Sequence, residues 1–202
     1  MEKIVRSETP DWLAEKWEEW GVAWEEKYQR NQKSSEFSWR QHNGFGKDNL
    51  VEKLLLMTHD HCSFCGISRM QVLQPTIEHF RPKTVFPRLA YQWENLFISC
   101  HKCQEKGDSF DDKLLKPDDE DYDFDTFFDI DWETGKLEPS EVATLEQKAR
   151  AKYTIEQYKL NDDGRPQARK DELETFQSSS LNLDNPYKWA YRFYLMRGNL
   201  IE

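Results

Sequence analysis

The sequence predicts an α+β fold that is mostly helical, in which N- and C-terminal helices surround a small zinc-bound finger. The four cysteines of the chain form two C-x2-C pairs on either side of a short β-forming stretch. Before and after this region, apolar residues recur at helical spacing. We expect one compact unit with three parts: an N-terminal helical segment (1–58), the finger (59–107), and an acidic segment with C-terminal helices that pack on the finger (108–202).

The first helix is expected to begin at Thr9-Pro10-Asp11, which offers a capping hydroxyl, a proline for the first turn and an acidic residue. An aromatic stripe follows at steps of mostly three and four residues: Trp12, Trp17, Trp20, Trp24 and Tyr28. Such a stripe is typical of a core or docking face, with a base-stacking platform as the alternative. A polar loop is predicted over 29–46, and a second helix over 48–58.

In the central region, residues 61–66 predict a tight turn carrying the first cysteine pair. A strand is expected over 76–80, a returning strand over 96–99, and a short helix after the second cysteine pair. The acidic segment 108–133 has alternating aromatic residues, which favours an edge strand or a lid, with a solvated loop as the alternative. Further helices are predicted at 141–160, 166–178 and 186–197.

Composition restricts the class of protein. The longest apolar runs are far shorter than the roughly 18 residues of a membrane span, and the N-terminus has no apolar signal region, so we expect a cytoplasmic protein. The formal net charge of −10 has the wrong sign for independent nucleic-acid binding. Residues 58–107 carry six Lys/Arg against four Asp/Glu, whereas residues 108–133 carry two against twelve. The acidity therefore lies outside the cysteine region.

The two cysteine pairs predict a metal site. Disulfides are rare in the cytoplasm, and four thiolates suit Zn²⁺ in a closed, structural site. The alternatives are four unrelated buried cysteines or an iron–sulfur cluster. Three histidines flank the pairs and could replace a ligand, although surface positions are more usual for them: His59, His61 and His101.

Glu78 and His79 lie between the cysteine pairs and offer the groups that phosphodiester hydrolysis requires. A histidine can deprotonate water at neutral pH. A divalent cation such as Mg²⁺ prefers oxygen ligands and can stabilise charge on the phosphate and the leaving oxygen. Because neighbouring strand residues point to opposite faces, both side chains can serve one site only if the strand bends or the site wraps around it.

The order C-x2-C, EHFRPK, W-x-N-L and C-x2-C, followed by Lys106-Gly107, resembles the HNH endonuclease motif. The resemblance implies a ββα-metal finger and metal-dependent hydrolysis of nucleic acid. It makes Glu78 a ligand of the catalytic divalent cation, His79 the general base and Asn95 a residue that fastens the connecting loop. The third metal position falls on Gln104 instead of the usual His or Asn, so water or His101 could complete the ligand set. Three basic residues are predicted to bind phosphate: Arg81, Lys83 and Lys106.

Outer segments extend the likeness: EKIVRSETPDWL, KLLKPDDEDYDFDTFFDIDWETGKLEP and TIEQYKLNDDGRPQAR. Together with the finger they resemble the PtuB family, the HNH subunits of Septu-type antiphage systems, including retron-associated versions. The resemblance implies a PtuA-like ABC-type ATPase as partner, DNA or RNA as substrate, and a retron reverse transcriptase with its nucleic acid as further partners. The alternatives are a non-catalytic zinc module that binds nucleic acid or a partner, and an adaptor whose Trp-rich helix docks on an ATPase.

Overall fold

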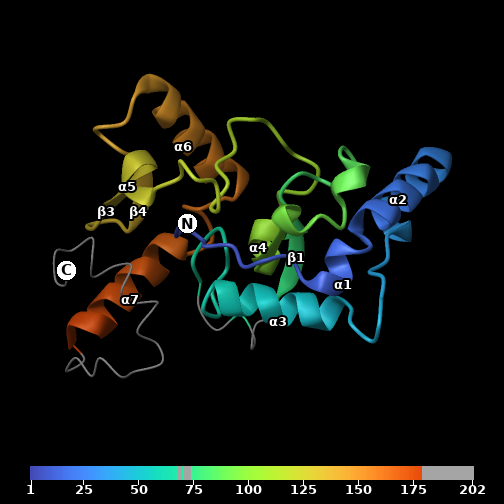
Figure 1. Cartoon of the computed structure of the whole chain (residues 1–202). Helices are drawn as coiled ribbons and strands as arrows, with labels where there is room; N and C mark the ends of the chain where they lie inside the picture. Colours follow the sequence, from blue (N-terminus) through green and yellow to red (C-terminus); the bar gives the residue numbers. More distant parts are fainter. Residues whose placement is uncertain (68–69, 71–73, 179–202) are drawn as a thin grey trace. The chain divides into compact units, whose positions relative to one another are not determined.

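The computed structural model describes residues 1–67, 70 and 74–178, which form two compact units (Figure 1). The finger unit comprises the described residues of Ile4–Ser63 and Arg69–Asp111. The C-terminal unit comprises those of Met1–Lys3, Phe64–Ser68 and Asp112–Glu202. Helices and two small antiparallel sheets make up the fold, which agrees with the predicted mixed class.

The N-terminal part of the finger unit contains α1 (Asp11–Ala14) and α2 (Trp17–Asn31), where the sequence predicted one continuous helix. Trp20 and Trp24 are buried, so the aromatic stripe contributes to the core, as its helical spacing indicated. Next to them, Gly21 allows a close approach between α2 and the 3-10 turn Pro87–Leu89. A Cβ atom at Gly21 would lie 2.2 Å from the carbonyl oxygen of Arg88, so only glycine fits there.

The rest of the finger unit follows the predicted order. Helix α3 (Lys47–Met57) precedes the hairpin of β1 (Thr76–His79) and β2 (Leu96–Ser99), and α4 (His101–Gln104) follows β2 directly. The two strands are antiparallel, with Thr76 opposite Ser99 and His79 opposite Leu96. All four residues of β2 are buried, since α3 packs against this strand. Figure 1 shows α4 and β1 together above α3.

The C-terminal unit contains α5 (Phe124–Phe127), β3 (Phe128–Asp131), β4 (Lys136–Pro139), α6 (Leu145–Gln157) and α7 (Arg165–Ser178). Strand β3 confirms a strand within the acidic segment, paired antiparallel with β4. Helix α6 begins later than predicted, because Thr144 and Gln147 form a capping box at its N-terminus. The helix predicted at 186–197 lies outside the described residues.

Aromatic packing and one buried arginine hold the C-terminal unit together. Phe64 stacks on Tyr158, with ring centroids 4.1 Å apart. Arg169 of α7 is buried and donates hydrogen bonds to the carbonyl oxygens of Gly135, at 2.7 Å, and of Leu160. The first bond links α7 to the turn between β3 and β4, and the second links it to the connection between α6 and α7. Among the described helices, none is long and apolar enough to cross a membrane.

Candidate active site and metal centre

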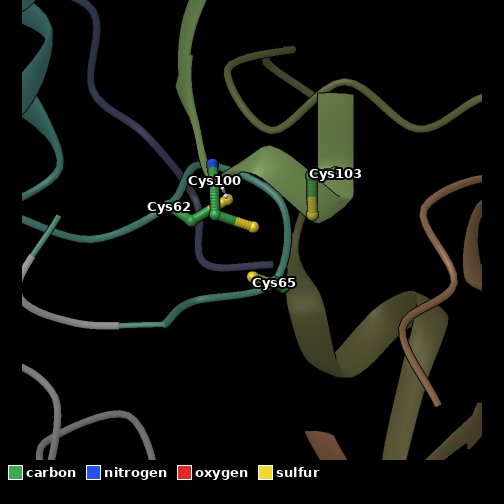
Figure 2. A group of neighbouring side chains, drawn as sticks. All are labelled: Cys62, Cys65, Cys100 and Cys103. Carbon is green, nitrogen blue, oxygen red and sulfur yellow. Dashed lines mark hydrogen bonds between the residues drawn. The ribbon is translucent and has the colours of Figure 1, made fainter. Parts of the chain in front are cut away.

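The four cysteines come together at the end of the β1–β2 hairpin. Cys62 and Cys65 lie on the turn after α3, Cys100 directly follows β2, and Cys103 lies in α4. The Ser63 N–H donates to the carbonyl oxygen of Ile98 at 3.0 Å, which places the first pair beside the end of β2. Figure 2 shows the side chains converging, and their sulfur atoms all lie within 4.8 Å of one another.

This arrangement suits a tetrahedral metal ion. Four sulfurs at about 2.3 Å from one zinc ion would be roughly 3.8 Å apart, so a small inward movement of the side chains completes the site. The Cys100 N–H donates to Cys62 Sγ at 3.4 Å, which joins the two cysteine pairs directly. Three of the cysteines are buried, and Cys65 is half-buried. The cluster could therefore hold a metal ion such as zinc, closed off by its four ligands.

The flanking histidines are not part of the cluster. In the described part of the chain, the group of side chains close enough to share an ion contains only the four cysteines. His61 instead contacts the carbonyl oxygens of Thr58 and His59 through Nδ1. His101 is exposed on α4.

His79, the predicted general base, is held in one tautomer. Its Nε2 lies 2.9 Å from the carbonyl oxygen of Ala90, and since a carbonyl only accepts, Nε2 carries the proton. The lone pair of the neutral ring is therefore on Nδ1. Burial, reinforced by the positive charges of Lys83 and Lys106, lowers the pKa of His79 to about 3, so the ring is neutral at physiological pH.

Three aromatic residues, Phe37, Trp39 and Tyr91, form a cover around His79. Trp39 stacks on the imidazole with centroids 5.5 Å apart and planes at 7°, and Phe37 meets its edge at 5.4 Å and 90°. Tyr91 packs on both aromatic residues and donates its hydroxyl to the Ser38 carbonyl at 2.6 Å. His79 is left 6 % exposed. Phe37 and Trp39 lie in the stretch 29–46 that was predicted as a polar loop, so this role was not predicted, although FSW is an aromatic cluster within that loop.

Replacing Trp39 by alanine is expected to expose His79. The stacked ring contributes about 1 kcal/mol beyond its buried area, and its loss opens a path to the imidazole. Carbethoxylation followed by mass spectrometry should show His79 reacting several-fold faster in the variant, with the other histidines unchanged. Trp132→Ala, which removes a half-buried tryptophan from the C-terminal unit, serves as the control. Equal His79 reactivity in wild type and Trp39→Ala would show that this ring does not limit access.

Glu78, the predicted metal ligand, is paired with a lysine. Its Oε1 lies 3.0 Å from Lys106 Nζ, and the Lys106 side chain is 0 % exposed. Burial raises the pKa of the Glu78 carboxyl to about 7, although the lysine charge acts in the opposite direction. Lys106 was predicted to bind phosphate, but in this structure its ammonium is enclosed and does not reach the surface.

Asn95, which the resemblance implies fastens the connecting loop, makes three side-chain hydrogen bonds to the backbone of that loop. Its side chain is buried, and Oδ1 accepts from the Arg81 N–H at 2.7 Å. Nδ2 donates to the carbonyl oxygens of Arg81 and Leu89, both at 3.0 Å. All three bonds go to the backbone of the connection between β1 and β2. This connection also carries the Ala90 carbonyl that orients His79, so Asn95 stabilises the surroundings of the imidazole.

The other predicted site residues, Gln104, Arg81 and Lys83, have fewer contacts that fix their side chains. Gln104 ends α4 and is half-buried, and its side chain makes no hydrogen bond with a described residue. Arg81 is exposed, with its guanidinium 5.6 Å from the ring centre of Phe86. Lys83 Nζ lies 5.3 Å from the ring centre of Phe37. The roles of these residues in metal or phosphate binding stay predictions.

A comparison with models of known protein families finds no match. The chain is similar to Septu protein PtuB of Bacillus thuringiensis, with 31% identity over 81 residues. The similarity covers 40% of this chain and 32% of that protein, so it spans about a third of the relative's length. It supports a PtuB-like relationship for part of the chain, whereas the HNH assignment depends on the motif residues alone.

Proposed function

We propose that the chain is an HNH-type nuclease that hydrolyses phosphodiester bonds of nucleic acid within an antiphage defence complex. The proposal depends mainly on the tautomer of His79. Its Nε2–H donates to the Ala90 carbonyl oxygen, so Nδ1 is the basic atom of the ring. The β1–β2–α4 order and the flanking cysteine cluster also agree with the ββα-metal finger that the resemblance implies. The similarity to a Septu protein supports the defence role.

In the proposed reaction, a water molecule attacks the phosphorus atom while its proton passes to His79 Nδ1. The bond from phosphorus to the leaving sugar oxygen breaks, that oxygen takes up a proton from solvent, and the protonated His79 returns its proton to solvent. Asn95 fixes the loop that carries the Ala90 carbonyl, and this carbonyl orients the imidazole. Since His79 is 6 % exposed, water reaches Nδ1 only after the cover of Phe37 and Trp39 moves aside.

The two predicted metal ions differ in how well the chain's residues fit them. Zinc fits the four-thiolate cluster, where it would cross-link the first cysteine turn to α4 and take no part in hydrolysis. A catalytic divalent cation on Glu78 and Gln104 fits poorly, because Glu78 Oε1 is already paired with Lys106. No step of the reaction is therefore assigned to such a cation.

The negative net charge of the chain supports a partner subunit that binds nucleic acid. A subunit with a net charge of −10 gains little affinity for nucleic acid from phosphate contacts. A PtuA-like ABC-type ATPase is therefore proposed to provide most of the binding affinity for DNA or RNA. The acidic segment 108–133 is proposed to dock on a basic partner or to shield the site until activation. Equal cleavage rates for the isolated chain and the full assembly at physiological salt would contradict this part of the proposal.

Replacing His79 by alanine is the direct test. Loss of a general base typically lowers the rate by about 10²- to 10⁴-fold, and we expect this loss in the complex purified from the native operon. Metal content, measured by mass spectrometry, should stay close to wild type, and circular dichroism should show a folded protein whose unfolding temperature is lowered by the loss of a buried ring. His101→Ala is the matched control, since this exposed histidine lies outside the proposed chemistry. A fully active His79→Ala complex would contradict the nuclease assignment.

One observation favours a second function, a non-catalytic zinc module that binds nucleic acid or a partner protein. His79 is enclosed by aromatic rings and Glu78 is ion-paired, as expected for a structural pair in a core. Under this alternative, the His79→Ala complex would retain its biological activity as long as the finger folds. The same experiment therefore separates the two functions.

A further inference from the structure

The Lys106 ammonium occupies a buried position with four oxygen acceptors. Glu78 Oε1 lies 3.0 Å from Nζ, and three carbonyl oxygens lie at 3.3–3.4 Å, those of Phe80, Gly107 and Ser109. A buried ammonium is expensive unless its charge is paired and its protons are hydrogen-bonded. Both conditions are met here, so the site is organised around a positive charge.

A divalent cation at the same carboxylate would have to share it with this ammonium. Mg²⁺ requires oxygen ligands at about 2.0–2.1 Å, so an ion bound to Glu78 Oε1 would lie within about 5 Å of Nζ, which is 3.0 Å from the same oxygen. Two positive charges at such a distance repel strongly in a buried site. The lysine is also difficult to displace, because three of its four acceptors are backbone carbonyls. The Glu78 charge is already balanced by the chain itself.

We propose that Lys106 is the built-in cation of this centre, and that Glu78 binds no divalent metal ion while Lys106 is in place. Lys106 is then a positioning residue: it holds the Glu78 carboxylate of β1 against the backbone of residues 107–109. The inference deepens the proposed function, on which its meaning for catalysis rests. It assigns to an internal ammonium the positive charge that balances the Glu78 carboxylate.

Manganese binding tests the proposal without measuring cleavage. Zinc-loaded full-length protein is titrated with Mn²⁺, and the free ion is followed by electron paramagnetic resonance. Acidic groups elsewhere will bind some Mn²⁺, so the informative quantity is the difference between wild type and Glu78→Gln. We expect the two titrations to coincide. An additional Mn²⁺ ion bound by wild type and lost in Glu78→Gln would overturn the proposal.

Thermal unfolding provides a second test through a double-mutant cycle. Lys106→Met leaves a buried carboxylate without a counter-ion, so the unfolding temperature should fall. Adding Glu78→Gln to this variant replaces the charge by an amide and should restore most of the loss. Simple additivity of the two effects would contradict the ion pair. If Lys106→Met does not fold, recovery of folding in the double variant counts as restoration, and its absence as contradiction. Neither test depends on His79, so this inference and the proposed nuclease can fail separately.

Discussion

Replacing Cys62 by serine is expected to release the bound metal ion and to unfold the region around the β1–β2 hairpin. A structural zinc site in small domains contributes about 10–16 kcal/mol of apparent binding free energy at neutral pH. This equals or exceeds the total stability of a typical domain, roughly 5–15 kcal/mol. The variant also loses a buried sulfur that accepts the Cys100 N–H, so the second cysteine pair loses a contact as well.

The measurements are zinc per chain and the unfolding temperature. We expect about one equivalent of zinc in wild type, and in Cys62→Ser less zinc and a lower unfolding temperature. His101→Ala, next to Cys100 but outside the sulfur cluster, should keep the zinc content of wild type. A chelator should reproduce the effect of Cys62→Ser in the wild-type protein. Wild-type zinc and stability in the serine variant would exclude the cluster as a structural zinc site.

The sequence predicted the β1–β2 hairpin and the neighbouring helices well, because the residue patterns that indicate them lie within the elements themselves. Strand β2 occupies the expected position, and α3 and β1 differ from prediction by one residue at the termini. Helix α4 begins at His101, within the second cysteine pair, where a helix was expected after the pair. The break between α1 and α2 was missed, since Glu15 and Lys16 carry no helix-ending signal. The aromatic stripe gives one hint of the break, because the step from Trp12 to Trp17 is five residues, whereas its later steps are three or four.

The surroundings of the site could not be predicted from local pattern. Two of the three residues that cover His79, Phe37 and Trp39, lie about forty residues earlier in the chain, so the cover exists only through tertiary packing. Lys106 was expected at the surface, where most lysines lie. Its burial follows from Glu78 and from carbonyls that the turn at Gly107 directs inward, and no sequence motif marks such a pocket.

Asn95 was expected from the resemblance alone, and the structure gives a physical reason for an amide at this position. The loop between β1 and β2 leaves one buried N–H and two carbonyl oxygens for it, and an asparagine satisfies all three. Aspartate has the same shape but presents an oxygen where the NH₂ group stood. We therefore expect Asn95→Asp to be more destabilising than its small chemical change suggests.

In Asn95→Asp, a buried carboxylate would face the carbonyl oxygens of Arg81 and Leu89 without a donor. An uncompensated buried charge costs roughly 3–5 kcal/mol, which we expect as the loss of unfolding free energy in urea at about pH 7.5. The new carboxyl has a folded-state pKa above its unfolded value of about 3.9, so the folded variant gains a proton on acidification. The loss of unfolding free energy relative to wild type should therefore be complete above that raised pKa, and it should become smaller as the pH falls toward about 5.

Asn49→Asp is the matched control for this experiment. Asn49 lies in the first turn of α3, and its Oδ1 accepts the Gly46 N–H at 3.0 Å, which a carboxylate does equally well. A negative charge there is also favourable to the helix N-terminus, so its stability should equal or slightly exceed wild type. If Asn95→Asp is as stable as this control at neutral pH, the NH₂ donors of Asn95 do not hold the loop. The orientation of His79 by the Ala90 carbonyl would then need another source, because that carbonyl directly follows Leu89, one of the residues that Asn95 fastens.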